Sequence, residues 1–445
     1  MNSGQSQPAY RLSPQQGRLA TLGRAADVYR TQVAARVSGA LDRQTVQRAA
    51  DRIAHRHTAL RLRLVHRPGS RRPLQRVAAE TDRALLPVLE AAAGAALHTV
   101  AAAVRDEAID LDGGPTARLH IGHDPDGDWL LLTLPALAAD SYSALVILGD
   151  LVRRIRAVPQ STDSDEPAPG PDVLTTAAFF LEIIEGQDDE DDEDDEDGDG
   201  DGDGEEEDDD ERAFWRELNA VTEPLRWPLD RPAEGPPRPA HIAVPVAGGA
   251  ETALRDLAQR TEVSLEAVVL AAFQTYAHRM TGRDTLRIQV SGWARDYDEL
   301  AAAVGPLRRW LPLDITRPDA AGDSRSLAGL ARATRRALDP LREYELGFDP
   351  EAQASAPGLA CDFVEVAPSA DMRVELVYAR DADHLLTLVC VDHGDRLVLA
   401  LHYDEARIPD DVAGHSAAVL SRWLEAVAAR PDEPLRALPL PIAPD

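Results

Sequence analysis

The stretch LPALAADSYS, residues 134–143, places a carboxylate, Asp140, beside three hydroxyl side chains, Ser141, Tyr142 and Ser143. A carboxylate can serve as a general base, and a serine can serve as a nucleophile where a histidine activates it. No histidine lies within this stretch, and the chain has no G-x-S-x-G motif to form a nucleophile elbow. The sequence therefore favours a capping role, in which one serine or Asp140 itself caps the helix that follows.

Residue types elsewhere exclude several other chemistries. All 47 basic residues are arginine, which leaves no lysine for a Schiff base or for a Walker-type phosphate loop. Cys361 and Cys390 lie in apolar, strand-like stretches, so we expect buried free thiols rather than a disulfide or a nucleophile. The sequence has no zinc-ligand spacing and no nucleotide fingerprint. It predicts neither a metal nor a bound cofactor.

The formal net charge of −30 is concentrated in one acidic tract, residues 188–211, which holds 20 Asp and Glu. Without the tract the charge is −10, and the remainder offers no basic face for nucleic acid or an anionic membrane. Residues 195–206 match the pattern of a calcium loop, but the sequence shows no amphipathic helix on either side of them. A specific calcium site and loose cation binding are alternatives, and the composition favours a disordered linker.

The length of 445 residues exceeds what one hydrophobic core usually serves, which predicts two lobes. No run of about 18 apolar residues is present, and the N-terminal residues have no signal-peptide core. We therefore expect a cytoplasmic protein without a membrane-spanning segment.

Periodicity and capping signals predict the elements that position the residues above. Ser13 and Gln16 form a capping box at the start of one helix, and Asp42 caps a second. The remaining expected elements are a helix at 96–107, two strands joined by a turn at 124–127, a helix from Ser141, a helix pair at 251–261 and 264–280, a hairpin turning at 393–395 and a closing helix after 410. Helices and mixed strands in two successive sets indicate two similar α/β lobes.

Taken in order, several segments resemble the condensation domains of nonribosomal peptide synthetases. They are YRLSPQQGRL, RHTALRLRL and IDLDGGPTARLHI in the first half of the chain, and FWRELNAVTEPLRWPLDRP, SLEAVVLAAFQTYAHRMTGRDTLRIQVSGWAR, VGPLRRWLPL and HYDEARIPDDVAGHSAAVLSRWLEAV in the second half. The resemblance covers nearly the whole chain. It implies an α/β (α+β) fold of two chloramphenicol-acetyltransferase-like lobes, arranged as a V-shaped pseudo-dimer around a central tunnel.

The resemblance also implies a division of the chain and a set of partners. The division is an N-terminal lobe at 1–172, a connecting helix at 173–187, the acidic disordered linker at 188–211 and a C-terminal lobe at 212–445. In that family the tunnel admits phosphopantetheine arms from two carrier proteins. The implied partners are therefore peptidyl carrier protein domains and an adenylation domain of the same assembly line, with substrates carried on phosphopantetheine and no cofactor bound by the chain itself.

The sequence departs from the family at its H-H-x-x-x-D-G motif. Matched by position, the two histidines fall on Pro135 and Ala136, the glycine falls on Ser141, and Asp140 is retained. The family pairs this aspartate with an arginine of the other lobe, which motif matching places at Arg295, as a structural ion pair. The candidates to line the tunnel are Leu137, Tyr142, Ser143, Arg309 and Trp310.

Two functions follow from this departure. Neither Pro135 nor Ala136 can accept a proton, which favours a catalytically inactive module that binds carrier-tethered aminoacyl groups and recruits a β-hydroxylase or another oxygenase. Such a module resembles the histidine-less, interface-type members of the superfamily. The alternative is an active condensation acyltransferase that forms an amide or ester bond through positioning alone, with Tyr142 or Ser143 orienting the acceptor. Arginines that would dock an acidic carrier are Arg18 and Arg24, or Arg153, Arg154 and Arg156.

Overall fold

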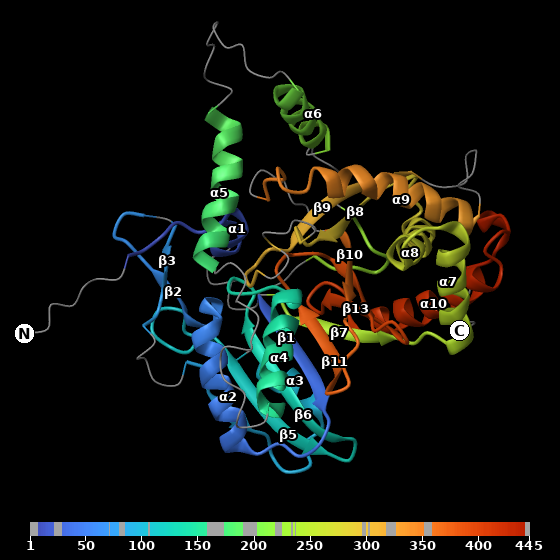
Figure 1. The fold of residues 1–445 in the computed structure, drawn as a ribbon. Helices are drawn as coiled ribbons and strands as arrows, with labels where there is room; N and C mark the ends of the chain where they lie inside the picture. Colours follow the sequence, from blue (N-terminus) through green and yellow to red (C-terminus); the bar gives the residue numbers. More distant parts are fainter. Residues whose placement is uncertain are drawn as a thin grey trace, which may run out of the picture.

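Two lobes, each built on one large β-sheet, make up the chain (Figure 1). The computed structural model describes residues 8–21, 29–70, 72–79, 85–105, 107–157, 173–189, 203–218, 225–232, 235, 237–295, 300, 303–316, 326–350 and 358–440. Arg24 and the stretch 158–172 lie outside these residues, as do positions 195–202 of the calcium-loop match. Among the described residues, no helix is long and apolar enough to cross a bilayer.

The N-terminal lobe has a five-stranded sheet with helices on both faces. Its strand order is β11-β1-β6-β5-β4, made of β11 (Met372–Ala379), β1 (Arg30–Val37), β6 (Gly127–Pro135), β5 (Arg118–Asp124) and β4 (Val88–Glu90). Helices α2 (Arg43–Arg56) and α4 (Ser141–Arg156) share a core with one face, and α3 (Leu97–Arg105) packs on the other. The hairpin β2 (Leu62–Val65) and β3 (Leu74–Val77) and helix α1 (Pro14–Thr21) complete this lobe.

Side-chain caps fix where these helices begin, as predicted. Gln16 N donates to Ser13 Oγ (3.2 Å) and Ser13 N donates to Gln16 Oε1 (2.9 Å), which is the predicted capping box of α1. The Asp42 side chain caps α2 by accepting from Thr45 N at 2.8 Å. These local bonds anchor the helix starts before any tertiary contact is considered.

The C-terminal lobe packs four helices on one face of a six-stranded sheet. Its order is β7-β13-β12-β10-β8-β9, made of β7 (Pro239–Val244), β13 (Leu397–Asp404), β12 (Leu386–Asp392), β10 (Leu359–Glu365), β8 (Thr285–Gly292) and β9 (Arg309–Thr316). The helices are α7 (Gly248–Thr261), α8 (Leu265–Thr281), α9 (Leu327–Glu343) and α10 (Asp410–Ala429). Cys361 and Cys390 are buried free thiols in this core.

Strand β11 crosses from the C-terminal half of the chain into the N-terminal sheet. It follows β10 in sequence, yet it pairs antiparallel with β1, from Thr31↔Ala379 to Val37↔Met372. It therefore departs from the predicted division, which assigned residues 212–445 entirely to the C-terminal lobe. The periodicity of a strand shows which face is buried but not which sheet it joins, since pairing partners are set by the tertiary fold.

Helices extend into both ends of the acidic tract, and its middle, where a disordered linker is predicted, lies outside the described residues. Helix α5 (Val173–Asp189) extends into its first two residues, and α6 (Asp203–Leu218) includes residues 203–211; residues 190–202 lie outside the described part. Acidic residues in the first turn of a helix stabilise it, because they interact favourably with the helix dipole. At the other end of α6, Trp215 Nε1 donates to Tyr344 O (2.8 Å), which docks the helix on the C-terminal lobe.

Candidate functional site

Asp140 is the N-cap of α4, held in the short loop that joins β6 to this helix. Its Oδ1 accepts from Ser143 N at 2.7 Å, and its Oδ2 accepts from Leu307 N (2.9 Å) and Arg308 N (3.0 Å). The two latter donors belong to the other lobe, just before β9. The carboxylate thus caps a helix of one lobe and receives main-chain donors from the second.

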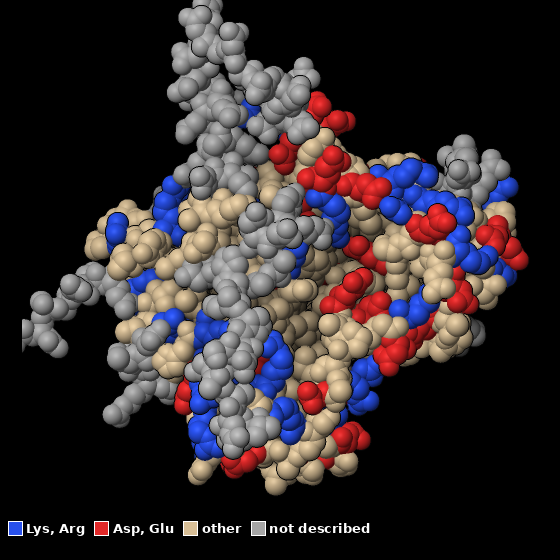
Figure 2. All heavy atoms as spheres, in the orientation of Figure 1, with Lys and Arg blue, Asp and Glu red and all other residues tan. Residues whose placement is uncertain are grey.

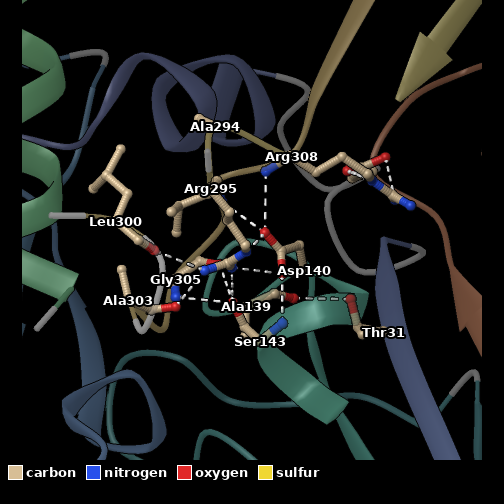
Figure 3. Close-up of polar contacts among 12 residues, drawn as sticks. Thr31, Ala139, Asp140, Ser143, Ala294, Arg295, Leu300, Ala303, Gly305 and Arg308 are labelled. Carbon is tan, nitrogen blue, oxygen red and sulfur yellow. Dashed lines mark hydrogen bonds and ion pairs between the residues drawn. The ribbon is translucent and has the colours of Figure 1, made fainter. Parts of the chain in front are cut away.

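Arg295, just after β8, completes this arrangement (Figure 3). Its Nη2 lies 3.4 Å from both Asp140 oxygens and donates to Ser143 Oγ at 2.8 Å. Its Nη1 donates to Ala303 O at 2.6 Å, and the guanidinium stacks 4.4 Å from the Tyr142 ring centroid. The two paired side chains are 6% and 1% exposed, so this ion pair is buried.

The geometry argues against Asp140 as a general base. Three main-chain donors and one guanidinium occupy the acceptor sites of its two oxygens, leaving no lone pair aimed at a substrate. Ser143 Oγ is equally engaged, since it donates to Gly305 O (2.8 Å) and accepts from Gly305 N (3.1 Å) and Arg295. These groups hold the two lobes together at this loop.

Pro135 and Ala136 stand where the motif has two histidines, and neither side chain has a group that can act as an acid or a base. Ala136 is 2% exposed, and its N–H donates to Tyr29 O at 3.1 Å. Ser141 is fully buried, and its Oγ has no hydrogen-bond partner among the described residues. The loop therefore has the contacts of Asp140 with Arg295 and the main chain, whereas positions 135 and 136 supply no proton acceptor.

The candidates to line a tunnel are mostly packed instead. Leu137 is 5% exposed, and Arg309 is buried with its guanidinium 4.4 Å from the Phe180 ring centroid. Tyr142 lies between Arg295 and Trp293, at 6.1 Å from the Trp293 ring. Trp310 is 3% exposed, and it lines a small cavity of about 30 Å³ together with Asp381 and His384.

A buried ionic cluster around Arg308 was not predicted from the sequence. Arg308 Nη1 donates to Asp362 Oδ2 at 2.5 Å and Nε donates to Asp381 Oδ2 at 2.9 Å, while Trp310 Nε1 donates to Asp381 Oδ1 at 2.7 Å. Burial raises the pKa of Asp362. Burial also acts to raise the pKa of Asp381, but the Arg308 ion pair and the Trp310 hydrogen bond together outweigh it and lower that pKa. The one signal in the sequence is Asp362 within the apolar run LACDFV, since a buried charge needs a partner.

A larger cavity, of about 400 Å³, lies between β11 and the C-terminal sheet. Neither this cavity nor the smaller one is lined by Ala136, Asp140 or Arg295. In the described part of the chain, no group of three or more His, Cys, Asp or Glu is placed to hold a metal ion.

Comparison with known proteins agrees with this architecture. Residues 6–168 match the sequence model of the Condensation domain family. Phosphinothricin tripeptide synthetase PhsB of Streptomyces viridochromogenes is 27% identical over 343 residues, which are 74% of this chain and 26% of that synthetase. The chain therefore spans about a quarter of the length of this relative.

Solved structures show the same fold over the whole length. The first condensation domain of the CDA synthetase has a TM-score of 0.76 at 16% identity, covering 97% of this chain and 99% of that one. The X-domain in its complex with OxyB from teicoplanin biosynthesis has a TM-score of 0.70 at 20% identity, covering 98% and 96%. The fold is thus the two-lobed, chloramphenicol-acetyltransferase-like one. Residues 6–168 thus match the condensation-domain family, and the chain as a whole shares the fold of condensation domains.

Proposed function

We propose that this chain is a non-catalytic condensation-like module that binds aminoacyl or peptidyl groups tethered to carrier proteins. The observation that carries the proposal is the state of the motif loop. Pro135 and Ala136 offer no base, and the Asp140 carboxylate is saturated by donors from both lobes. Loss of a general base usually lowers a rate by about 10²–10⁴.

Helices α2 and α4 supply a surface that fits an acidic carrier domain. The two helices carry seven arginines and two aspartates, although the whole chain is acidic. Arg48, Arg52 and Arg153 are exposed, and Figure 2 shows basic side chains gathered over this part of the surface. Opposite charge on two partners raises the association rate and selects the docking face.

A tailoring oxygenase is the further partner that we propose. The X-domain from teicoplanin biosynthesis forms a complex with OxyB, and that X-domain shares the fold of this chain. A module that holds a loaded carrier without consuming its thioester is suited to presenting the bound residue to a second enzyme.

The first test is a transfer assay with two phosphopantetheinylated carriers, one loaded as donor and one as acceptor, followed by intact-protein mass spectrometry. We expect no transfer of acyl mass above the enzyme-free control, together with measurable binding of the loaded carrier. A condensation domain that retains both histidines serves as the positive control. Transfer above background would instead establish the active acyltransferase, with a base outside the motif loop.

The docking face has its own matched test. The triple variant Arg48→Glu, Arg52→Glu and Arg153→Glu should weaken carrier binding at least tenfold, because it reverses the charge of the face. A control triple, Arg332→Glu, Arg335→Glu and Arg336→Glu, makes the same charge change on exposed positions of α9. Equal weakening by both variants would mean that only net charge matters and that α2 and α4 are not the docking face.

A further inference from the structure

The cavity of about 400 Å³ runs along the edge of β11 that faces away from β1. In Figure 1 this strand lies at the boundary of the two lobes, beside β7. The volume lies within the range of roughly 300–1,000 Å³ that is typical of small-ligand sites. Its walls are mainly aliphatic and include Val377, Val389, Val391, Val398 and Ala400.

The register of β11 leaves main-chain N–H and C=O groups that point outward from this edge. In an antiparallel pair, residues that bond to the partner strand alternate with residues that do not. Arg380 N donates to Arg30 O, so Tyr378 and Leu376 also face β1, whereas Ala379 and Val377 turn their N–H and C=O away from it. β11 is the terminal strand of its sheet, and the bonds given for the described residues include none to the main chain of Val377 or Ala379 from that side. Val377 lines the larger cavity and Ala379 lines the adjoining smaller one, and His402 belongs to both walls.

Imidazoles and the Glu375 carboxylate add hydrogen-bonding groups to a mainly aliphatic wall. Arg105 Nη1 lies 3.2 Å from His241 Nδ1, and a guanidinium can only donate, so Nδ1 accepts and Nε2 of the neutral ring carries the proton. Burial and Arg105 lower the pKa of His241 to about 4, which keeps the ring neutral near pH 7. The Tyr378 ring stacks on the His402 imidazole, with the two ring centroids 5.0 Å apart, and holds that imidazole in place.

We propose that this cavity binds the backbone of a peptide in extended conformation, which adds as a strand to the free edge of β11. Ligand residues two positions apart pair with Val377 and Ala379, and their side chains lie against the valines. A peptide held as a thioester has no C-terminal carboxylate, which suits a wall that carries the neutral His241 imidazole and the Glu375 carboxylate. The inference deepens the proposed function: it rests on that function and names a peptidyl chain, rather than a single aminoacyl group, as the tethered substrate.

A capped tripeptide tests the proposal directly. We would titrate the protein with acetyl-Leu-Tyr-Leu-amide by calorimetry, and with the same peptide N-methylated at its three residues. N-methylation removes the donors and blocks strand pairing but keeps the side chains, so affinity should fall at least tenfold. Hydrogen exchange followed by mass spectrometry should show that the unmethylated peptide slows exchange in the segment 372–379.

A pair of variants locates the site. Ala400→Trp fills the cavity from β13 and should abolish peptide binding, whereas Val65→Trp, on the half-buried hairpin strand β2, should leave it unchanged. Equal affinity for the two peptides, or full binding by Ala400→Trp, would overturn the proposal. If Ala400→Trp does not fold, the affinities of the two peptides and the hydrogen exchange of residues 372–379 still test the proposal.

Carrier binding separates this inference from the proposed function. If the protein binds the loaded carrier but not the tripeptide, the strand-addition site is overturned and the proposed function stands. If the protein binds the tripeptide through β11 but does not bind the carrier, the strand-addition site stands and the function proposed above is overturned.

Discussion

Two serines on the first turn of α4 show how different the roles of neighbouring residues are. Ser143 Oγ makes three hydrogen bonds that join α4 to Gly305 and Arg295, whereas the buried Ser141 Oγ makes none with the described residues. The chain has Ser141 where a glycine is expected by motif matching. A hydroxyl there adds a polar group to a site that does not use it.

These roles predict opposite outcomes for two identical substitutions. Ser143→Ala should lower the free energy of unfolding by about 1–3 kcal/mol, because it leaves buried partners unsatisfied. Ser141→Ala should leave that free energy unchanged or raise it by up to about 1 kcal/mol, because it removes an unsatisfied hydroxyl. Unfolding in urea measures both. A loss of more than about 2 kcal/mol for Ser141→Ala would show that its hydroxyl has a partner that the loop geometry does not reveal.

The buried pair of Asp140 and Arg295 makes a second prediction at this scale. Arg295→Ala strands a carboxylate that is 1% exposed and should cost about 3–5 kcal/mol. The control is Arg260→Ala, whose ion pair with Asp432 has side chains that are 55% and 71% exposed, with an expected loss below about 1 kcal/mol. Similar losses for both variants in denaturant unfolding would mean that Asp140 is stabilised by its main-chain donors alone.

At the scale of elements, strands β7, β13 and β11 meet through stacked rings. His241 and His402 face each other across β7 and β13, and Tyr378 of β11 stacks on His402. Arg105 of α3 covers Tyr378 at 4.6 Å from its ring centroid. A positive charge on either histidine would therefore lie beside Arg105 at the boundary of the lobes.

This contact predicts a loss of stability in mild acid. The pKa of His241 is about 4 in the folded protein, against an ordinary 6.5, with burial as the first cause. The unfolded chain takes up the proton first, so the stabilisation is complete above pH 6.5 and is lost as the pH falls towards 4. The loss should amount to roughly 1–3 kcal/mol, since His241 is partly exposed.

The measurement is the free energy of unfolding between pH 7 and pH 4. His241→Gln should flatten the dependence by this amount, whereas His123→Gln, at an exposed position, should leave the slope of the parent protein. Identical slopes in all three proteins would assign the pH dependence to other groups, such as the buried His384 and His402.

Local signals in the sequence predicted most elements but not how the lobes connect. The caps at Ser13 and Asp42 and the turn at 124–127 depend on neighbours in the chain, and each is present. The crossing of β11 and the cluster of Arg308 with Asp362 and Asp381 join residues more than 50 positions apart. Periodicity carries no information on such partners, whereas the pairing of Asp140 with Arg295 was proposed only through the family motif.

At the scale of the whole molecule, charge is separated between two regions. The acidic tract holds 20 of the 77 acidic residues, whereas the face of α2 and α4 is rich in arginine. The acidic carrier that we propose as a partner would be attracted to that face and repelled by the overall charge of −30. Both effects decline with salt, because the Debye length shortens from about 10 Å at 0.1 M to about 3 Å at 1 M.

Deletion of residues 190–202 tests this balance. It removes ten acidic residues and changes the formal charge from −30 to −20, while α2 and α4 stay intact. The association rate of an acidic carrier, measured by stopped flow, should rise several-fold at 20 mM salt and match that of the full chain at 1 M salt. A control chain in which the same ten positions are Asn or Gln keeps the length and should behave like the deletion. If only the deletion accelerates binding, the tract hinders the carrier by its bulk, and charge is not the cause.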